Sequence, residues 1–146
     1  MTGIPVTYAR LTAETASSLV GAPCFDNRVD PAGLDAFVAD PGHEMIFAEA
    51  DGTVIGFASG TVLLHPDKPP AFFVNEVGVE EEWRRQGVAT ELVRRLLDLA
   101  RERGCRGVWL ATETDNAAAR ALYRALGARE TGGIVVYDWD GAMDAG

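Results

Sequence analysis

The sequence predicts an α/β fold built on one mixed β-sheet. Strand-like and helix-like segments follow one another in the order strand, two helices, three strands, helix, strand, helix, strand. Asp51-Gly52 separates two apolar runs, which is the pattern of a β-hairpin turn. A long segment in the second half carries apolar residues three and four positions apart, as in an amphipathic helix that covers a sheet.

The first quarter of the chain contains one expected strand and two expected helices. Ile4–Arg10 is rich in β-branched residues and is expected to be a strand. A helix is expected to open at Thr12, with Glu14 in its first turn. After a loop broken by glycine and proline, Asp30-Pro31 supplies an N-cap acid and a proline at the first helical position, so a second helix is expected there.

The middle and end of the chain supply the remaining elements. Three strands are expected at 45–50, 53–64 and 71–79. The long helix is expected over 87–103, a buried strand over 108–111, a helix over 116–126 and a last strand over 134–139. Gly104 and Gly127 stand where the two helices should end.

Size and composition indicate one domain, residues 1–140, followed by a flexible tail at 141–146. Two cysteines are too few for a disulfide framework, and no secretory signal or membrane-spanning run is found, so a cytoplasmic location is expected. The net charge of −9 disfavours nucleic acid as a partner and favours a cationic one. No residue cluster has the spacing of metal ligands, so no metal is expected.

The turn before the long helix has the features of a phosphate site. The first N–H groups of a helix lack internal partners, and the helix dipole favours an anion there. Gly87 has no Cβ to hold a pyrophosphate away, and Arg84 and Arg85 add positive charge. An ordinary basic turn before a helix is the alternative, and neither the dinucleotide fingerprint nor the P-loop pattern is present.

Two segments resemble the signature motifs of the GNAT superfamily of N-acetyltransferases. Arg84-Arg85-Gln86-Gly87-Val88-Ala89 is similar to its Arg/Gln-x-x-Gly-x-Gly/Ala motif. The segment 116–128, Asn-Ala-Ala-Ala-Arg-Ala-Leu-Tyr-Arg-Ala-Leu-Gly-Ala, resembles its second signature, although Ala128 replaces the usual phenylalanine. The resemblance covers roughly residues 47–139. It implies a mostly antiparallel central sheet of about six to seven strands flanked by about four helices.

The resemblance implies an enzyme that uses acetyl-CoA as co-substrate. By this likeness, Val77, Gly78 and Val79 border the pantetheine arm. The residues expected to hold the pyrophosphate are Arg84, Arg85, Gln86, Gly87, Val88, Ala89 and Thr90. Asn116, Ala119 and Tyr123 are expected to border coenzyme A from the second motif.

Acetyl transfer to an amine needs a base and an acid. The amine must lose a proton, and the departing thiolate must gain one. Glu76, in an otherwise apolar strand just before the phosphate loop, is the candidate base, and a solvated or substrate-binding role is its alternative. Tyr123, at the place where many GNAT enzymes carry a tyrosine that donates to the sulfur, is the candidate acid and can also pack its helix.

The acceptor is expected to be a small cationic amine. The segments 75–79, 83–90 and 136–140 resemble the short aminoglycoside 3-N-acetyltransferases, which implies acetylation of an aminoglycoside antibiotic at the 3-N position and drug resistance. Carboxylates suit a polycation, so Glu76 is expected to bind substrate together with Glu113, Asp115, Asp138 and Asp140. Taken singly, each of the last four also reads as a solvated surface acid.

Other functions stay open at this point. The same scaffold could acetylate a protein N-terminus, a lysine, a polyamine or a small metabolite amine. A non-catalytic module that only binds acetyl-CoA is a further alternative, although Glu76, Asn116 and Tyr123 favour an enzyme. The resemblance also leaves room for a homodimer formed through the last strand.

Overall fold

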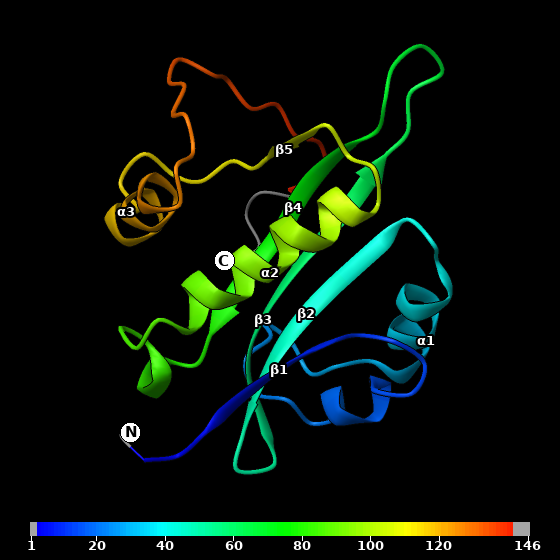
Figure 1. The fold of residues 1–146 in the computed structure, drawn as a ribbon, viewed down its shortest axis with the longest axis vertical. Coiled ribbons are helices and arrows are strands. Elements are labelled where there is room, and N and C mark those ends of the chain that lie inside the picture. Colours follow the sequence, from blue (N-terminus) through cyan, green and yellow to red (C-terminus); the bar gives the residue numbers. More distant parts are fainter. Residues whose placement is uncertain (1–2, 142–146) are drawn as a thin grey trace. The chain divides into compact units, whose positions relative to one another are not determined.

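The structure is a computed structural model that describes residues 3–141. These residues fall into two compact units, one within Met1–Ala111 and one within Thr112–Gly146. Of the described residues, those of the first unit form a sheet with two α-helices, and those of the second form one α-helix (Figure 1). The tail expected at 141–146 lies, apart from Gly141, outside the described residues.

The described part of the first unit is built around one five-stranded sheet with the order β1-β2-β3-β4-β5. The first four strands are antiparallel neighbours, and β5 pairs with β4 in parallel. The bounds are Val6–Arg10 for β1, His43–Ala50 for β2, Thr53–Leu63 for β3, Ala71–Val79 for β4 and Gly107–Trp109 for β5. Helix α2 (Val88–Glu102) forms the connection between β4 and β5, because two neighbouring parallel strands need a long crossover between them.

The helices begin where the sequence provides caps. The α-helices are α1 (Pro31–Ala39), α2 (Val88–Glu102) and α3 (Ala117–Ala125), and the short 3₁₀ turns are η1 (Ala16–Leu19) and η2 (Glu81–Trp83). Asp30 caps α1 by accepting a hydrogen bond from the Gly33 N–H at 2.9 Å. Asn116 caps α3 in the same way through the Ala119 N–H at 3.0 Å.

The two faces of the sheet carry different cores. Helix α2 packs across strands β2, β3 and β4 on one face (Figure 1). The other face is covered by η1, α1 and the loop between them, through residues that include Leu19, Phe25 and Phe37. Because β3 is covered on both sides, its residues Val54–Gly60 are all buried, which explains the nearly continuous apolar run of that strand.

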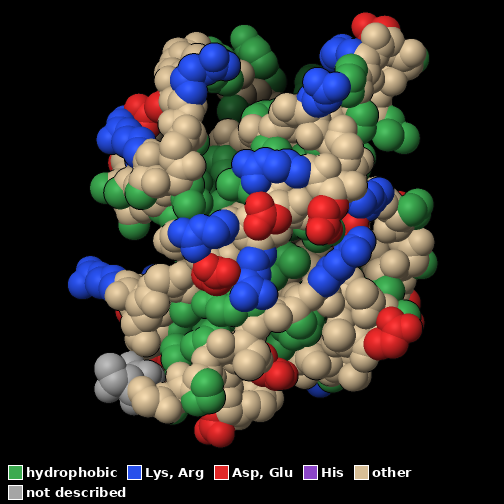
Figure 2. Space-filling model, viewed as in Figure 1, with side chains coloured by type: hydrophobic (Ala, Val, Ile, Leu, Met, Phe, Trp, Pro, Cys, Tyr) green, Lys and Arg blue, Asp and Glu red, His purple; other side chains and the backbone are tan. Residues whose placement is uncertain are grey.

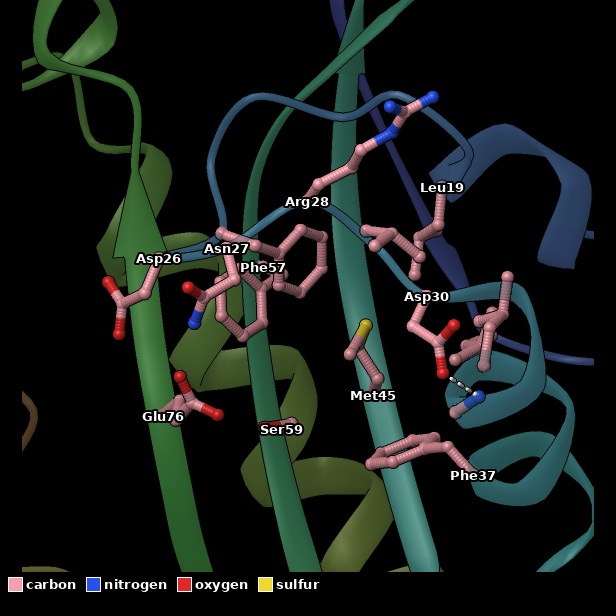
Figure 3. Close-up of a pocket in the computed structure, with 15 residues that line it drawn as sticks. Leu19, Asp26, Asn27, Arg28, Asp30, Phe37, Met45, Phe57, Ser59 and Glu76 are labelled. Carbon is pink, nitrogen blue, oxygen red and sulfur yellow. Dashed lines mark hydrogen bonds between the residues drawn. The ribbon is translucent and has the colours of Figure 1, made fainter. Parts of the chain in front are cut away.

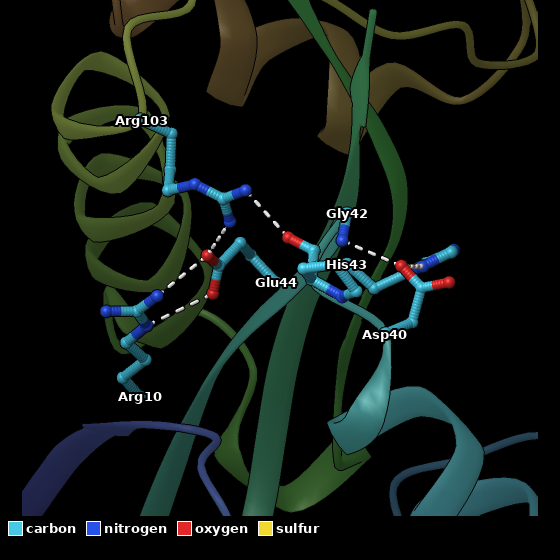
Figure 4. Close-up of polar contacts among 7 residues, drawn as sticks. Arg10, Asp40, Gly42, His43, Glu44 and Arg103 are labelled. Carbon is cyan, nitrogen blue, oxygen red and sulfur yellow. Dashed lines mark hydrogen bonds and ion pairs between the residues drawn. The ribbon is translucent and has the colours of Figure 1, made fainter.

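One buried carboxylate joins β1, β2 and the end of α2. Glu44 is 4% exposed and accepts hydrogen bonds from Arg10 at 3.1 and 2.7 Å (Figure 4). Arg103 also donates to Glu44, and its second terminal nitrogen donates to the Pro41 carbonyl at 2.6 Å. A buried charge is tolerated only when it is paired, so this cluster fixes the helix end against the strand edge.

The solvent face of α2 is highly charged but mixed in sign. Glu91 binds Arg94 and Arg95 at 2.6 and 2.8 Å, and Asp98 binds Arg101 at 3.0 Å. Figure 2 shows the basic and acidic side chains interspersed over the helix. This face therefore offers no patch of a single sign, despite the net charge of −9.

The α/β class and the mixed sheet are confirmed, with five strands and three α-helices in the described residues where six to seven strands and about four helices were expected. The helix expected at Thr12 is wrong; only the 3₁₀ turn η1 forms. Its cause is local: the Thr12 N–H donates to the Thr15 hydroxyl at 2.8 Å, and that hydroxyl donates to the Arg10 carbonyl at 2.9 Å. Such bonds compete with helical ones.

The last expected strand, 134–139, is also wrong. Within the described chain this segment has no ladder partner, and Ile134 and Tyr137 are 72% and 80% exposed. The prediction rested on β-branched and aromatic residues. The strand propensity of these residues reflects how well they pack against neighbouring strands. It therefore does not predict a strand where no neighbouring strand is present.

Candidate active site

Glu76 lies in a row of side chains that crosses three strands. The register pairs Met45 of β2 with Ser59 of β3, and Ser59 with Glu76 of β4. A register shift in β4 creates this row: Gly60 pairs with Val74, so a regular ladder would bring Asn75, not Glu76, opposite Ser59. The extra residue is a β-bulge, a feature that commonly re-aims side chains beside functional sites.

The row opens into a pocket of about 370 Å³ in the first unit (Figure 3). This volume lies in the range of small-molecule sites. The apolar lining residues include Leu11, Leu19, Phe37, Met45 and Phe57. The polar lining residues are Asp26, Asn27, Arg28, Asp30, Ser59 and Glu76. The pocket therefore offers both polar and apolar contacts to a ligand (Figure 3).

The loop before α1 forms the roof of the pocket and is held close to the sheet. The Phe25 ring stacks on the Phe57 ring with centroids 4.1 Å apart. A Cβ added at Gly78 would lie 3.2 Å from the Cys24 carbonyl oxygen and 2.9 Å from the Phe57 ring, so the loop passes directly over this glycine. Burial raises the pKa of the Cys24 thiol to about 11, as a closely packed loop requires.

The structure adds pocket residues that the sequence analysis missed. Asp26, Asn27 and Arg28 belong to a segment that was read only as a loop, and Ser59 to a strand that was read only as apolar. The available signal was weak. Ser59 is the polar residue in the run Val54–Gly60, and nothing in the sequence states which residue of β4 it faces.

The phosphate loop has the conformation that an anion site needs. Gly87 is the N-cap of α2 at φ 82°, and no side chain caps the helix. Arg85 also has a positive φ, 63°. The N–H groups of the first helical turn are thus left for a ligand, and the two left-handed residues orient the preceding backbone around it. A Cβ at Gly87 would touch nothing in the protein, so the space in front of the helix is open.

Two of the expected phosphate-site side chains also hold the loop together. The Arg84 Nε donates to the Val79 carbonyl at 3.1 Å. The Gln86 amide donates to the Glu82 carbonyl at 3.1 Å. Both bonds fix the loop against the end of β4 and η2, which preorganises the helix terminus. Val88 is buried in the core beneath α2, so only its backbone N–H is placed to serve the expected phosphate site.

Strand β4 also has an open edge for the pantetheine arm. Strand β5 pairs only with Ala71, Phe72 and Phe73. Beyond Phe73, the edge of β4 that faces β5 has no ladder partner within the described residues, and this part includes Val77, Gly78 and Val79. An unpaired strand edge followed by an uncapped helix terminus fits an elongated ligand that carries amide groups and a diphosphate. The residues present therefore fit acetyl-CoA.

The second signature segment forms α3 in the second unit. The Asn116 side chain and the Ala119 N–H, both expected beside coenzyme A, bond to each other as the helix cap. Tyr123 lies in the middle of the helix, and burial raises the pKa of its phenol. Its hydroxyl therefore keeps its proton throughout the neutral range, as a proton donor must.

The four other expected substrate acids also belong to the second unit. Glu113 and Asp115 lie in the turn before α3, and Asp138 and Asp140 follow the segment 134–137; all four are exposed. Another acid of this unit is engaged instead. Arg120 and Arg124 bind Glu130 and hold the pKa of its carboxyl down to about 2. The acids that line the pocket of the first unit are Asp26, Asp30 and Glu76.

Metal-ligand clusters and membrane-spanning helices are absent from residues 3–141. No group of three or more metal-ligating side chains was found among residues 3–141. None of the helices that the structure describes is long and apolar enough to cross a bilayer.

Comparison with known proteins identifies the fold and its relatives. The model of the acetyltransferase (GNAT) family matches residues 13–128. The chain is 35% identical over 132 residues to the N-alpha-acetyltransferase RimI of Mycobacterium tuberculosis, covering 88% of this chain and 81% of that protein. It is 30% identical over 115 residues to an aminoglycoside N(6')-acetyltransferase type 1 of Salmonella typhimurium, covering 70% and 79%.

A solved structure has the same fold. The aminoglycoside N-acetyltransferase AAC(6')-Iy in complex with CoA superposes with a TM-score of 0.77 at 22% identity, covering 94% of this chain and 97% of that one. The relatives described here are thus a 6'-N enzyme type and a protein N-terminal type, where the sequence analysis expected the 3-N type.

Proposed function

The chain belongs to the acetyltransferase (GNAT) family and is an acetyl-CoA-dependent N-acetyltransferase, and from this premise we propose that it acetylates a primary amine held in the pocket beside Glu76. The observation that carries the proposal is the register that turns Glu76 into that pocket. The carboxylate has no ion-pair or hydrogen-bond partner among the described residues, so it is available to a ligand.

Each residue has a defined task in the reaction. Acetyl-CoA supplies an acetyl group activated as a thioester. The helix terminus at Gly87 and the open edge of β4 hold it. Glu76 accepts a proton from the ammonium of the acceptor, which frees the nitrogen lone pair to form the new C–N bond. After the C–N bond forms, the nitrogen releases its second proton to solvent. As the C–S bond breaks, the Tyr123 hydroxyl donates a proton to the departing sulfur, and the phenolate regains a proton from solvent.

We propose an aminoglycoside amine as the acceptor, acetylated at the 3-N position. The pocket carries three carboxylates, Asp26, Asp30 and Glu76, against the single cation Arg28. This charge suits a ligand with several ammonium groups. The 3-N position rests on the likeness of 75–79 and 83–90 to the 3-N enzymes. The relative of the 6'-N type supports the substrate class rather than this position.

The apolar lining residues of the pocket favour a second candidate acceptor, the α-amine of a protein N-terminus. Phe25, Phe37, Met45 and Phe57 could receive an apolar first side chain while Glu76 faces the amine. The relative at 35% identity is an N-alpha-acetyltransferase. The two candidates differ in charge, since an aminoglycoside carries several cations and a peptide terminus carries one.

An assay of thiol release with three acceptors separates these functions. We expect gentamicin to give the highest kcat/KM, ahead of a peptide with a free N-terminal alanine and ahead of spermidine. Its KM should rise several-fold when ionic strength goes from about 0.05 to about 0.5 M, because screening weakens multiple charge contacts. Mass spectrometry and NMR of the product then give the acetylated position. A higher kcat/KM for the peptide than for gentamicin would favour the α-amine of a protein N-terminus as the acceptor instead of an aminoglycoside amine.

The variant Glu76→Gln tests the base. It keeps the size of the side chain but cannot accept the proton, so kcat should fall about 100-fold or more. The affinity for acetyl-CoA should stay unchanged. Glu49→Gln on β2 is the matched control, because Glu49 lies outside the pocket lining. Equal turnover in Glu76→Gln and Glu49→Gln would remove Glu76 as the base.

A further inference from the structure

Ser59 is a largely buried polar residue in the lining of the pocket, and its side chain has no hydrogen-bond partner among the described residues. It is 3% exposed, in the middle of a strand that is covered on both faces. Within the part of the chain that the structure describes, its hydroxyl makes no hydrogen bond. Because Ser59 lines the pocket, its hydroxyl reaches the pocket space, where water or a ligand can bond to it.

The Ser59 side chain lies on the pocket face, next to Glu76. The two residues are directly opposite each other across β3 and β4, and both line the pocket (Figure 3). Their register places the two side chains on neighbouring strands at the same level of the pocket. One small ligand group can therefore touch both side chains. The third member of the row, Met45, is apolar and cannot satisfy the hydroxyl through its carbon atoms.

We propose that Ser59 binds the nitrogen of the acceptor amine, together with Glu76, and so sets the direction from which the amine attacks. This proposal rests on the proposed function and assigns the pocket a second polar contact. The hydroxyl oxygen accepts one N–H of the amine, and the Glu76 carboxylate accepts another. The ligand thereby supplies the hydrogen bond that the folded chain leaves unmade at Ser59.

The geometry follows from the valence of the nitrogen. A primary ammonium has three N–H bonds, and one proton passes to Glu76, which leaves the lone pair along the broken N–H bond. The amine then turns, so that its two remaining N–H bonds donate to the carbonyl oxygen of the protonated Glu76 carboxyl and to the Ser59 hydroxyl oxygen. The lone pair is thereby directed away from both side chains. Fixing the nucleophile in this way raises the rate of attack, since fewer bound orientations are unproductive. Ser59 is thus a positioning residue that touches the acceptor and takes no proton.

The bulge in β4 is required for this arrangement. Without the extra residue, Ser59 would face Asn75, whose amide instead donates to the Thr61 hydroxyl at 2.8 Å. Gly60, the neighbour of Ser59, admits no side chain, because a Cβ there would lie 2.1 Å from the Phe72 ring. These contacts stabilise the register in which the Ser59 hydroxyl lies opposite the Glu76 carboxylate.

The variant Ser59→Ala tests the proposal, with Ser18→Ala as control. Ser18 is exposed in η1 and does not line the pocket. For Ser59→Ala we expect the gentamicin KM, and its dissociation constant measured by calorimetry in the presence of CoA, to rise about 10-fold, the effect of one hydrogen bond to a charged group. The acetyl-CoA KM should not change. The free energy of unfolding should stay close to that of the parent, because the hydroxyl makes no hydrogen bond within the described residues.

The variant Ser59→Thr and the activity of the parent enzyme distinguish a failure of the role of Ser59 from a failure of the proposed function. Ser59→Thr keeps the hydroxyl and should bind gentamicin within about 3-fold of the parent. Equal gentamicin affinity in the parent and Ser59→Ala, with the parent active, would overturn the role of Ser59 and leave the proposed function intact. A loss of affinity that only accompanies a lower unfolding free energy would also overturn it. A parent that acetylates neither gentamicin nor the alanine peptide would end the proposed function, and the role of Ser59 with it.

Discussion

The phosphate loop and the acceptor pocket are built from the chain in opposite ways. The loop uses consecutive residues, 84–90, and offers mainly backbone N–H groups at the start of α2. The pocket draws its lining from η1, the following loop, α1 and three strands, and offers side chains. In the function that we propose, the co-substrate is therefore recognised by local backbone geometry, and the acceptor by long-range register. A change of acceptor can follow from side-chain changes that leave the loop untouched.

The largest expected effect is a lower reactivity of Cys24, which lies in the loop that covers the pocket. Burial places the pKa of Cys24 near 11, against 9.0 for an ordinary thiol. At pH 8 the folded protein should therefore hold about 100-fold less thiolate at this position, and alkylation by iodoacetamide should slow by about that factor relative to the chain in denaturant. Peptide mapping by mass spectrometry assigns the rate to Cys24.

The same shift has a consequence for stability against pH. The unfolded thiol ionises near pH 9.0 and the folded one only near 11. The unfolded state thus loses its proton first, so this group makes unfolding easier as pH rises through that window. Labelling of Cys24 at the rate of a free thiol would show that the loop does not close over the sheet. The pocket would then be open on the side of this loop, and it would differ even more from the phosphate loop, which is already formed without a ligand.

A smaller effect, on co-substrate affinity, tests the phosphate loop. Gly87→Ala places a methyl group in the open space before α2 and strains a residue at φ 82°. Weakening one charge-assisted hydrogen bond to the diphosphate should raise the acetyl-CoA dissociation constant about 30-fold. The matched control is Gly104→Ala at the other end of α2, with φ 80° and equal free space. Both variants should lose about 1 kcal/mol of stability.

Equal acetyl-CoA affinity in the two glycine variants would contradict the assignment. The expected stability loss is the same in both because the strain is the same, so thermal unfolding serves as the internal standard. Only the position relative to the helix terminus differs. A difference in affinity at matched stability therefore reports the diphosphate contact alone.

The contrast between the two regions also explains what could be predicted from the sequence. The strands 71–79 and 53–63, the turn at Asp51-Gly52 and the long helix depend on neighbours in sequence, and each appears within one or two residues of its predicted bounds. The same holds for Gly87, whose role needs only the helix start. The family resemblance rested on such local segments, and for that reason it identified the enzyme class.

The sequence could not predict the features that depend on distant partners. The pairing of Ser59 with Glu76 follows from a one-residue bulge, and no local pattern marks Asn75 as the extra residue. The segment 134–139 has strand propensity, yet it finds no partner strand in the described residues. Of the acids expected to bind substrate, Glu76 lines the pocket, whereas the other four belong to the second unit; Asp26 and Asp30 enter the pocket through the fold of the first unit.

The smallest expected effect tests whether the acceptor pocket can be changed without disturbing the phosphate loop. In Gly78→Ala the new methyl group would meet the Phe57 ring at 2.9 Å and the Cys24 carbonyl at 3.2 Å, so the roof must move away from the sheet. We expect the acceptor KM to rise about 10-fold, through loss of about 1.4 kcal/mol of binding energy. The acetyl-CoA dissociation constant should change less than about 3-fold, because the backbone groups of β4 remain.

The matched control for this substitution is Gly107→Ala on β5, where a Cβ has no atom within 4 Å. It should leave both substrates unaffected. A rise in acetyl-CoA dissociation constant as large as the rise in acceptor KM would mean that the roof over Gly78 and the open edge of β4 act as one site. The acceptor would then no longer be recognised independently of the co-substrate, since a shift of the loop at Cys24 would reach both, and side-chain changes in the pocket could not alter acceptor choice alone.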